Sequence, residues 1–312
     1  MSACDFVLTS PARYRLVDFD VSLHFSGANP AQLQYADDWF RKVLGPFQLA
    51  ETPAIKGDDD VGGEPQKRAS RRNSREVLLQ DGSEAITVTR DGCKLNFHYR
   101  LPANGGDDLA YLTRSEEITL DYAVTRSSDK FWIHAACIVR GESLVFLVAP
   151  SGFGKTTLSL GLAHHGFLIA TDDVVLFDVV EDRLILCPRC PRIRGTALSQ
   201  LGSIGVDLSA DADLISRYVV LPPNRFQSAS PPLTHAAIHV FFLSKGGPSG
   251  RESLSRLSLS RGIMEIARHS NLLAQDPDLR FFESVFGKAS FYRLQIGDFA
   301  RDLAEILATV ER

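Results

Sequence analysis

The stretch from residue 146 to residue 177, FLVAPSGFGKTTLSLGLAHHGFLIATDDVVLF, constrains the fold more than any other part of the chain. An apolar run is followed by a glycine-rich segment, and then by a run of leucines and small residues that ends at Gly166, a residue type common at helix ends. Two further apolar runs flank Asp172 and Asp173. This order predicts a strand, a loop, a helix and two more strands, with the loop and helix between two core strands of one sheet. We therefore expect an α/β fold.

The glycine-rich segment APSGFGKT, residues 149–156, fits the phosphate-binding loop (Walker A) pattern, with alanine where the first glycine is commonest. Gly152 and Gly154 allow backbone conformations that turn several N–H groups toward one centre, and the following helix adds positive potential at its N-terminus. The segment therefore predicts nucleotide binding, and the alternative is a glycine-rich turn with an exposed lysine. The expected binding residues are Ser151, Gly152, Phe153, Gly154, Lys155, Thr156 and Thr157.

Three side chains at the end of this segment have separate roles toward a bound nucleotide. Lys155 brings a full positive charge to the outer phosphates. Thr156 offers a hydroxyl to Mg²⁺, and Thr157 can bond a nearer, inner phosphate. Together they predict a site for a phosphate chain and its metal ion.

The pair Asp172-Asp173 follows the apolar run FLIAT, 17 and 18 residues after Lys155. A strand that ends beside the loop would deliver both carboxylates to the phosphates. Because adjacent strand residues point to opposite faces, we expect different roles: one accepts the proton of an attacking hydroxyl, and the other holds Mg²⁺ directly or through water. A turn-forming pair on the surface is the alternative. His134, in the apolar run FWIHAACIV, is either a hydrogen-bonded core residue or a site residue near Asp172.

At these residues the chain resembles the HPr kinase/phosphorylase superfamily, bacterial P-loop serine kinases, and within it the group called HprK-related kinase A. The family has a histidine on one strand, a second strand, the loop, a helix that ends in glycine, and a strand that ends in Asp-Asp. His134, SLVFLVA, PSGFGKT, LSLGLAHHG and FLIATDD follow that order, and the intervals between them match. PRIRGTALSQLG is similar to the family's Arg-Gly signature, at Arg194 and Gly195. The clear resemblance covers about 130–200, and a looser one continues to the end.

The resemblance implies a P-loop kinase core of the HPr kinase/phosphorylase type, which transfers the γ-phosphate of ATP, bound with Mg²⁺, to a Ser or Thr hydroxyl of a small protein or peptide. Asp172 would be the base, with His134 beside it to tune its charge, and Thr156 and Asp173 would hold the metal. Arg194 is the first candidate to stabilise the transferring phosphoryl group, and Arg225 is the second. The implied catalytic residues are therefore Asp172, His134, Lys155 and Arg194.

Two positions depart from the family pattern. Thr157 stands where HPr kinases have an acidic residue, which bears on the metal geometry and on the reverse phosphorolysis reaction. Arg192 stands where the signature begins with glutamate, which bears on the substrate. A small-molecule hydroxyl kinase on the same scaffold, and a nucleotide-binding regulatory or scaffold protein with little turnover, are therefore the alternative functions.

The rest of the chain predicts two regions. Residues 1–125 read as an α+β region of unknown role, with strands in YRLVDFDVSLHF, a helix in PAQLQYADDWFRKVLG, and short strands with turns from 76 to about 125. Residues 53–75 are polar and glycine-rich, which predicts a mobile linker or loop. The resemblance implies that residues 126–312 are an HPr-kinase-like P-loop kinase domain, with helices expected at about 258–273 and after Asp298. The resemblance implies that these helices pack subunits of a homo-oligomer or contact a protein substrate, and helices that simply cover the sheet are the alternative.

Composition excludes some classes of function. The 312 residues carry a net charge of −4, which disfavours a large nucleic-acid surface. No apolar run approaches the roughly 20 residues that cross a bilayer, and the N-terminal sequence lacks a signal-peptide pattern, so we expect a cytoplasmic protein with no membrane partner. The five cysteines do not suggest a disulfide scaffold, and the pair Cys187 and Cys190 has no second pair at zinc-like spacing.

Overall fold

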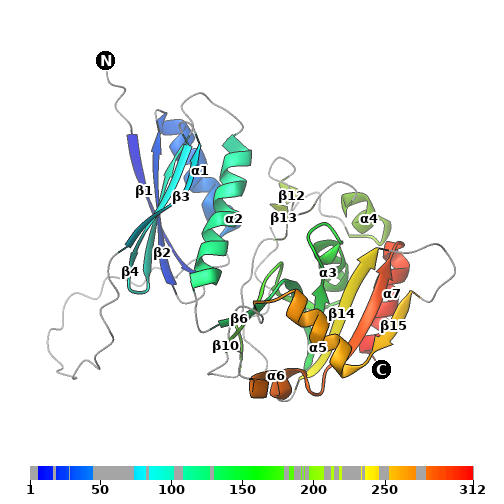
Figure 1. Cartoon of the computed structure of the whole chain (residues 1–312). Helices are drawn as coiled ribbons and strands as arrows, with labels where there is room; N and C mark the ends of the chain where they lie inside the picture. Colours follow the sequence, from blue (N-terminus) through cyan, green and yellow to red (C-terminus); the bar gives the residue numbers. More distant parts are fainter. Residues whose placement is uncertain are drawn as a thin grey trace, which may run out of the picture. The chain divides into compact units, whose positions relative to one another are not determined.

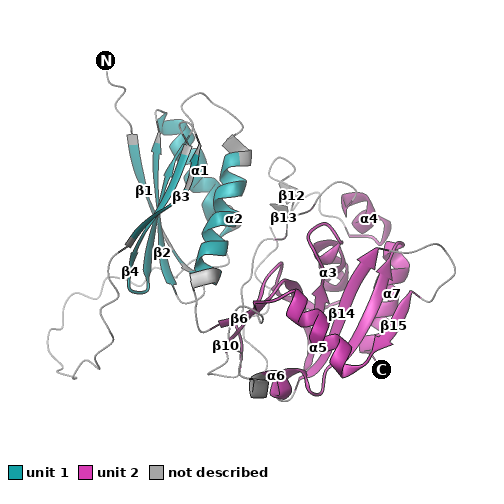
Figure 2. Cartoon of the chain, viewed as in Figure 1, with its two compact units in different colours: residues 1–127 teal, residues 128–312 magenta. Residues whose placement is uncertain are grey.

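The chain divides into two compact units, Met1–Ser127 and Ser128–Arg312, in a computed structural model (Figures 1 and 2). The structure describes residues 6–16, 19–27, 29–44, 74–81, 84–101, 108–126, 130–178, 183–185, 191, 193, 197–206, 212–213, 218–219, 233, 236–245, 253–271 and 279–311. The expected mobile segment 53–75 lies outside these residues, except for Ser74 and Arg75, which begin a strand.

The first unit is a five-stranded sheet with two helices. The strands are β1 (Phe6–Leu16), β2 (Phe19–Gly27), β3 (Ser74–Asp81), β4 (Glu84–Asp91) and β5 (Lys94–Arg100). Their order is β1-β2-β5-β4-β3, and all neighbours are antiparallel except β2 and β5. The helices are α1 (Pro30–Val43) and α2 (Asp108–Arg126), which contact each other as well as the sheet. The predictions of strands up to residue 100 and of the helix from Pro30 are therefore confirmed.

The prediction of short strands up to about 125 is wrong for α2. The buried side of this helix mixes apolar residues such as Leu112 and Ala123 with polar ones, since Ser115, Glu116 and Thr119 are fully buried as well. The Ser115 hydroxyl donates to the carbonyl of Tyr111 at 2.8 Å, and the Thr119 hydroxyl lies 2.6 Å from that of Tyr99 in β5. A helix that buries hydroxyl and carboxyl groups lacks the apolar periodicity by which helices are predicted.

The second unit is built on a six-stranded mixed sheet in the order β15-β16-β14-β8-β7-β9. The three central parallel strands are β8 (Ser143–Val148), β14 (Ala237–Lys245) and β16 (Ser290–Ile296). The antiparallel ones are β7 (Ala135–Arg140), which pairs with β8 and with β9 (Leu168–Thr171), and β15 (Leu254–Leu257), which pairs with β16. A mixed α/β unit was predicted, and β8 and β9 lie in one sheet as expected.

Helices cover both faces of this sheet and divide its core in two. One cluster joins the sheet to α3 (Lys155–His164), α4 (Ala197–Ser203) and α7 (Phe299–Val310). The other joins it to α5 (Leu259–Arg268) and α6 (Leu279–Phe286). The last helix is capped as predicted, because the Asp298 side chain accepts from the N–H of Arg301 at 2.9 Å. No helix in the described part of the chain is long and apolar enough to cross a membrane.

A small second sheet, β11-β10-β6, determines where the site forms. Its strands are β6 (Lys130–Ile133), β10 (Val175–Asp178) and β11 (Arg183–Ile185). The chain passes from β6 into β7 at His134, and from β9 into β10 across residues 172–174. Because β6 pairs with β10 and β7 pairs with β9, the two crossings between sheets lie opposite each other. A separate two-stranded ribbon is formed by β12 (Ala212–Asp213) and β13 (Tyr218–Val219).

Candidate active site

The glycine-rich loop leaves the end of β8 and leads into α3, as the sequence predicted. Gly152 has φ +83° and Gly154 has φ +79°, in the left-handed region that favours glycine. Gly154 is also the N-cap residue of α3, so the first N–H groups of this helix have no cap side chain from that position. The segment therefore has two left-handed glycines directly before a helix N-terminus, an arrangement that can bind an anion.

Lys155 is buried, with 5% of its surface exposed, so the alternative of an exposed lysine in a turn does not hold. Its ammonium donates to the carbonyls of Ala149 at 2.8 Å and Pro150 at 3.3 Å, at the start of the loop. It also lies 2.8 Å from Nε2 of His134. Burial lowers the pKa of Lys155, and Asp173 acts in the opposite direction. The lysine thus ties the loop to the crossing between the two sheets.

His134 lies at the crossing from β6 to β7, where its N–H donates to the carbonyl of His269 at 2.7 Å. Burial lowers the pKa of His134, and the charge of Lys155 lowers it further. The imidazole is therefore neutral at neutral pH, and Nε2 accepts from the lysine while the ring proton is on Nδ1. The 3.5 Å approach of Nε2 to Asp173 is accordingly a contact and not an ion pair.

The two aspartates occupy a turn after β9, where the Thr171 hydroxyl donates to the carbonyl of Val174 at 2.6 Å. Asp172 is buried, and its Oδ2 accepts from the hydroxyl of Thr156 at 2.9 Å. The Asp173 side chain is 42% exposed, and its Oδ1 lies 3.8 Å from the Lys155 ammonium. These carboxylates differ in both exposure and neighbours, as two separate roles require.

Asp173 has φ +80°, and it is the only described residue other than glycine with a positive φ. This conformation is uncommon for an L-residue, though aspartate tolerates it better than most. Backbone strain of this kind is concentrated at functional sites, where it aims a side chain. Here it separates the directions of two neighbouring carboxylates.

Asp172 and Asp173 each contact the residue that the sequence led us to expect beside the other. Thr156, the expected metal-side hydroxyl, bonds to Asp172, the expected base. His134, which was expected to tune Asp172, lies against Asp173, the expected metal ligand. The expectation assumed that both aspartates continue a strand, whereas they lie in a turn whose left-handed residue sets their directions.

The other expected residues fall into two groups. Ser151 is exposed, Phe153 is half-buried and Thr157 is buried on the first turn of α3. Several lie outside the described residues, so the structure places none of the expected arginines or the cysteine pair: Arg192, Arg194, Gly195, Arg225, Cys187 and Cys190.

His269, which follows α5, was not predicted as a site residue. Its carbonyl accepts from the backbone N–H of His134, and its imidazole lies within the electrostatic range of the Lys155 ammonium. Burial lowers the pKa of His269, Glu265 opposes this, and Lys155 adds to the lowering. Asn271 holds the same segment to β6, because its Oδ1 accepts from the N–H of Trp132 at 2.9 Å. Nothing in the sequence indicates this pairing, since the two segments are far apart along the chain.

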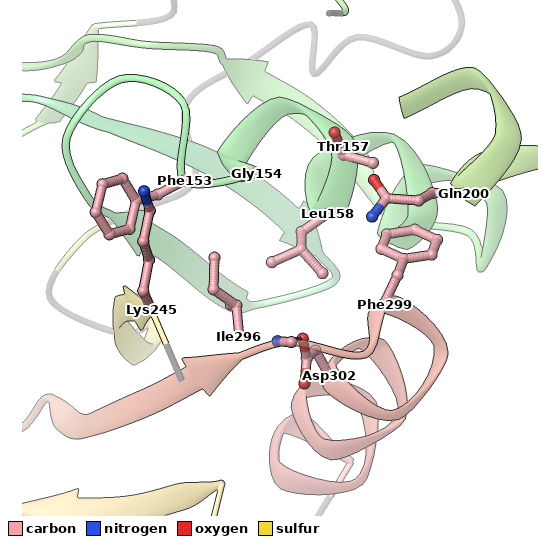
Figure 3. A pocket seen from close by; sticks show the side chains of 10 residues that line it. Phe153, Gly154, Thr157, Leu158, Gln200, Lys245, Ile296, Phe299 and Asp302 are labelled. Carbon is pink, nitrogen blue, oxygen red and sulfur yellow. Dashed lines mark hydrogen bonds between the residues drawn. The ribbon is translucent and has the colours of Figure 1, made fainter. Parts of the chain in front are cut away.

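A cavity of about 170 Å³ lies beside the loop, on the surface of the second unit (Figure 3). The lining residues from the loop, α3 and α4 are Phe153, Gly154, Thr157, Leu158 and Gln200. Those from the ends of β14 and β16 and the start of α7 are Lys245, Ile296, Gly297, Phe299 and Asp302. Of these ten, the sequence predicted only Phe153, Gly154 and Thr157 as binding residues.

The metal expectation can be tested against the side chains present. Among the described residues, no group of three or more His, Cys, Asp or Glu side chains could hold a metal ion. Mg²⁺ that accompanies a nucleotide needs only one or two protein oxygens, because phosphates and waters complete its shell. The Thr156 hydroxyl and the Asp172 carboxylate, 2.9 Å apart, fit that smaller requirement.

Comparison with known proteins finds similarity among solved structures alone. No family model matches the chain, and no curated protein matches it at a significant level. Among solved structures it is similar to the HPr(Ser) kinase/phosphatase from Coxiella burnetii, with 18% sequence identity and a TM-score of 0.31. That match covers 58% of this chain and 88% of the other. At this TM-score it carries no argument about activity, so the function has to be argued from the residues of the site.

Proposed function

We propose that the chain is an ATP-dependent kinase, which transfers the γ-phosphate to a Ser or Thr hydroxyl of a small protein or peptide. The observation that carries this proposal is the buried ammonium of Lys155, 2.8 Å from His134 and 3.8 Å from Asp173. One cation thus connects a phosphate-binding loop to a potential base. A loop that only bound phosphate would not need the histidine and the second carboxylate.

The phosphates would lie on the N–H groups of the loop and of the first turn of α3, with Lys155 at the outer ones. Thr156 and Asp172 would hold Mg²⁺, which neutralises charge on the phosphates. Asp172 suits this role because it is buried and accepts a hydrogen bond from the Thr156 hydroxyl, which places the two oxygens side by side.

Asp173 suits the role of base. Its carboxylate, 42% exposed, is the one of the pair that an incoming hydroxyl can reach, and it lies 3.8 Å from the Lys155 ammonium, which would be at the outer phosphates. The carboxylate would take the proton of the acceptor hydroxyl while the acceptor oxygen bonds to the γ-phosphorus. The bond from that phosphorus to the bridging oxygen breaks, and ADP leaves.

The first test is calorimetric titration of the full chain with ATP, with and without Mg²⁺, on the parent and on Lys155→Ala. We expect Mg²⁺-dependent binding that the variant loses. A second measurement incubates the chain and γ-labelled ATP with an array of Ser- and Thr-containing peptides. Transfer of the γ-phosphate label to any of the peptides would support the proposed kinase activity. ATP binding with no label on any peptide would instead favour a nucleotide-binding regulatory protein, and an absence of ATP binding by the parent would overturn the proposal.

A further inference from the structure

We infer that the cavity beside the loop binds the base and ribose of the nucleotide, and not the phosphate acceptor. The inference rests on the proposed function and adds to it a nucleoside site formed by α3, α4, α7 and the ends of β14 and β16. It predicts that a large part of the affinity for ATP comes from outside the phosphate-binding loop.

Two neighbouring threonines of α3 indicate the direction of the phosphate chain. Thr156 and Thr157 are consecutive residues of α3, so their side chains point about 100° apart. Thr156 contacts Asp172, on the side where transfer would occur, whereas Thr157 lines the cavity. A phosphate chain on the loop between them has its reactive end near Thr156. Its other end, which carries the nucleoside, then lies toward Thr157 and the cavity.

The lining of the cavity is mainly apolar, with aromatic rings and a few polar groups. Figure 3 shows Phe153 beside Lys245 at one end of the cavity and Phe299 beside Gln200 at the other. Leu158 supplies apolar surface between these two ends. An apolar cleft with an aromatic ring at each end and a few polar groups suits a flat heteroaromatic ring better than a polar peptide.

The polar groups match the rest of a nucleoside. The Lys245 ammonium lies 5.3 Å from the centre of the Phe153 ring, a cation–π contact that holds it at the rim. The Gln200 amide and the Thr157 hydroxyl offer donors and acceptors to ribose hydroxyls or ring nitrogens.

One wall of the cavity is held in place by hydrogen bonds within the chain. Asp302, on the first turn of α7, is buried and accepts from the N–H of Gly297 at 2.9 Å and from Arg301 at 2.6 Å. These bonds fix the turn between β16 and α7. Gly161 of α3 leaves room for Phe299, because a Cβ there would lie 3.0 Å from its ring. A preformed wall binds without the cost of ordering it.

The acceptor is the competing occupant, and the geometry disfavours it. An acceptor hydroxyl must approach Asp173 and the reactive end of the phosphates. Asp173, His134 and Lys155 are not among the described lining residues of the cavity. An acceptor bound in the cavity would present its hydroxyl to the wrong end of the phosphate chain.

The test compares ATP with inorganic tripolyphosphate, which has the phosphates and no nucleoside. Both are titrated into the full chain with Mg²⁺, for the parent, Ile296→Trp and Lys245→Ala. We expect the parent to prefer ATP, and Ile296→Trp to lose at least about tenfold in ATP affinity with tripolyphosphate affinity unchanged within about twofold. If Ile296→Trp does not fold, Lys245→Ala provides the test instead, because it changes an exposed side chain. It should likewise lower the ratio of ATP affinity to tripolyphosphate affinity. Met264→Trp, on the exposed face of α5, is the matched control and should alter neither affinity.

The possible failures are distinguishable. If the parent binds tripolyphosphate and ATP equally, or if both cavity variants keep the parent's ratio, the nucleoside site is wrong and the phosphate site stands. If the parent binds neither ligand, the proposed function fails and this inference fails with it. Lys155→Ala should weaken both ligands together, which separates loss of the phosphate site from loss of the cavity.

Discussion

The ammonium of Lys155 lies 2.8 Å from Nε2 of His134, at the point where the chain passes from the small sheet into the large one. This contact requires a neutral imidazole, because a protonated ring has no lone pair to accept with and would repel the lysine. The lysine of the loop and the histidine of the crossing therefore depend on each other for their charge states.

That dependence gives a pH effect on stability. Because the pKa of His134 is lowered in the folded chain, the unfolded chain binds more protons between the folded pKa and the ordinary value of 6.5. The free energy of unfolding should therefore fall as pH decreases from 6.5 through the folded pKa, and stay level above 6.5 as far as this group is concerned. His134→Gln cannot titrate, so its stability should fall less over the same range. Denaturant unfolding at several pH values, followed by Trp132 fluorescence in a Trp39→Phe background, measures the difference, and equal slopes would contradict the neutral imidazole.

The exchange of partners at the aspartate pair predicts different defects for the two asparagine variants. Asp173→Asn should keep Mg²⁺-dependent ATP binding and lose phosphoryl transfer by about 10²-fold or more, because the amide cannot accept the acceptor's proton. Asp172→Asn should instead weaken the Mg²⁺ dependence of ATP binding, since the carboxylate beside Thr156 is lost. Binding and transfer are measured on the same preparations. If Asp172→Asn abolishes transfer while its Mg²⁺ response is normal, the roles follow the original sequence expectation.

The left-handed backbone at Gly154 predicts a cost for any side chain there. A Cβ at this position meets nothing within 4 Å, so the cost of Gly154→Ala is strain of the backbone alone, about 1–2 kcal/mol in free energy of unfolding. Gly202, within α4, also has open space around it, and Gly202→Ala should leave stability unchanged or raise it by roughly 0.5–1 kcal/mol. Chemical denaturation of the two variants provides the comparison. Equal effects would mean that the conformation of the loop differs from the one described.

The buried hydroxyl pair of the first unit predicts a loss of stability confined to that unit. Thr119→Val removes the partner of the Tyr99 hydroxyl inside the core and should cost about 1–3 kcal/mol. Arg114→Ala, at an exposed position of the same helix, should stay within about 0.5 kcal/mol of the parent. Trp39 lies in the first unit and Trp132 in the second, so fluorescence in Trp→Phe backgrounds reports each unit separately. A matching loss in the Trp132 signal would show that the effect is not local.

The parts of the site that depend on neighbours in sequence were predictable. The loop, α3 and the position of the aspartate pair after a strand follow from glycine positions and apolar spacing, because these features are local. The turn that sets the directions of Asp172 and Asp173 was not predicted. The crossing from β6 to β7 at His134 was not predictable. The nine-residue apolar run that contains it gives no sign that the chain leaves one sheet there and enters another. That crossing depends on pairing with β10 and with the segment at Asn271, both remote along the chain.

In the rest of the fold, too, elements with a local sequence pattern were predictable and the others were not. Strands with alternating polarity and the capped helices α1 and α7 followed their patterns. Helix α2 did not, because hydroxyl and carboxyl groups are buried among its apolar residues and interrupt the apolar spacing. The cavity was missed for a different reason. Its walls come from four separate segments, and only their packing brings Phe153, Leu158 and Ile296 together.

The anchoring of Lys155 has a consequence for the thermodynamics of ligand capture. A free lysine side chain loses about 2 kcal/mol of rotamer freedom when it is confined. Here the carbonyls of Ala149 and Pro150 and the ring of His134 confine it in the absence of any ligand. That loss belongs to folding, so an arriving phosphate meets a charge that is already immobilised.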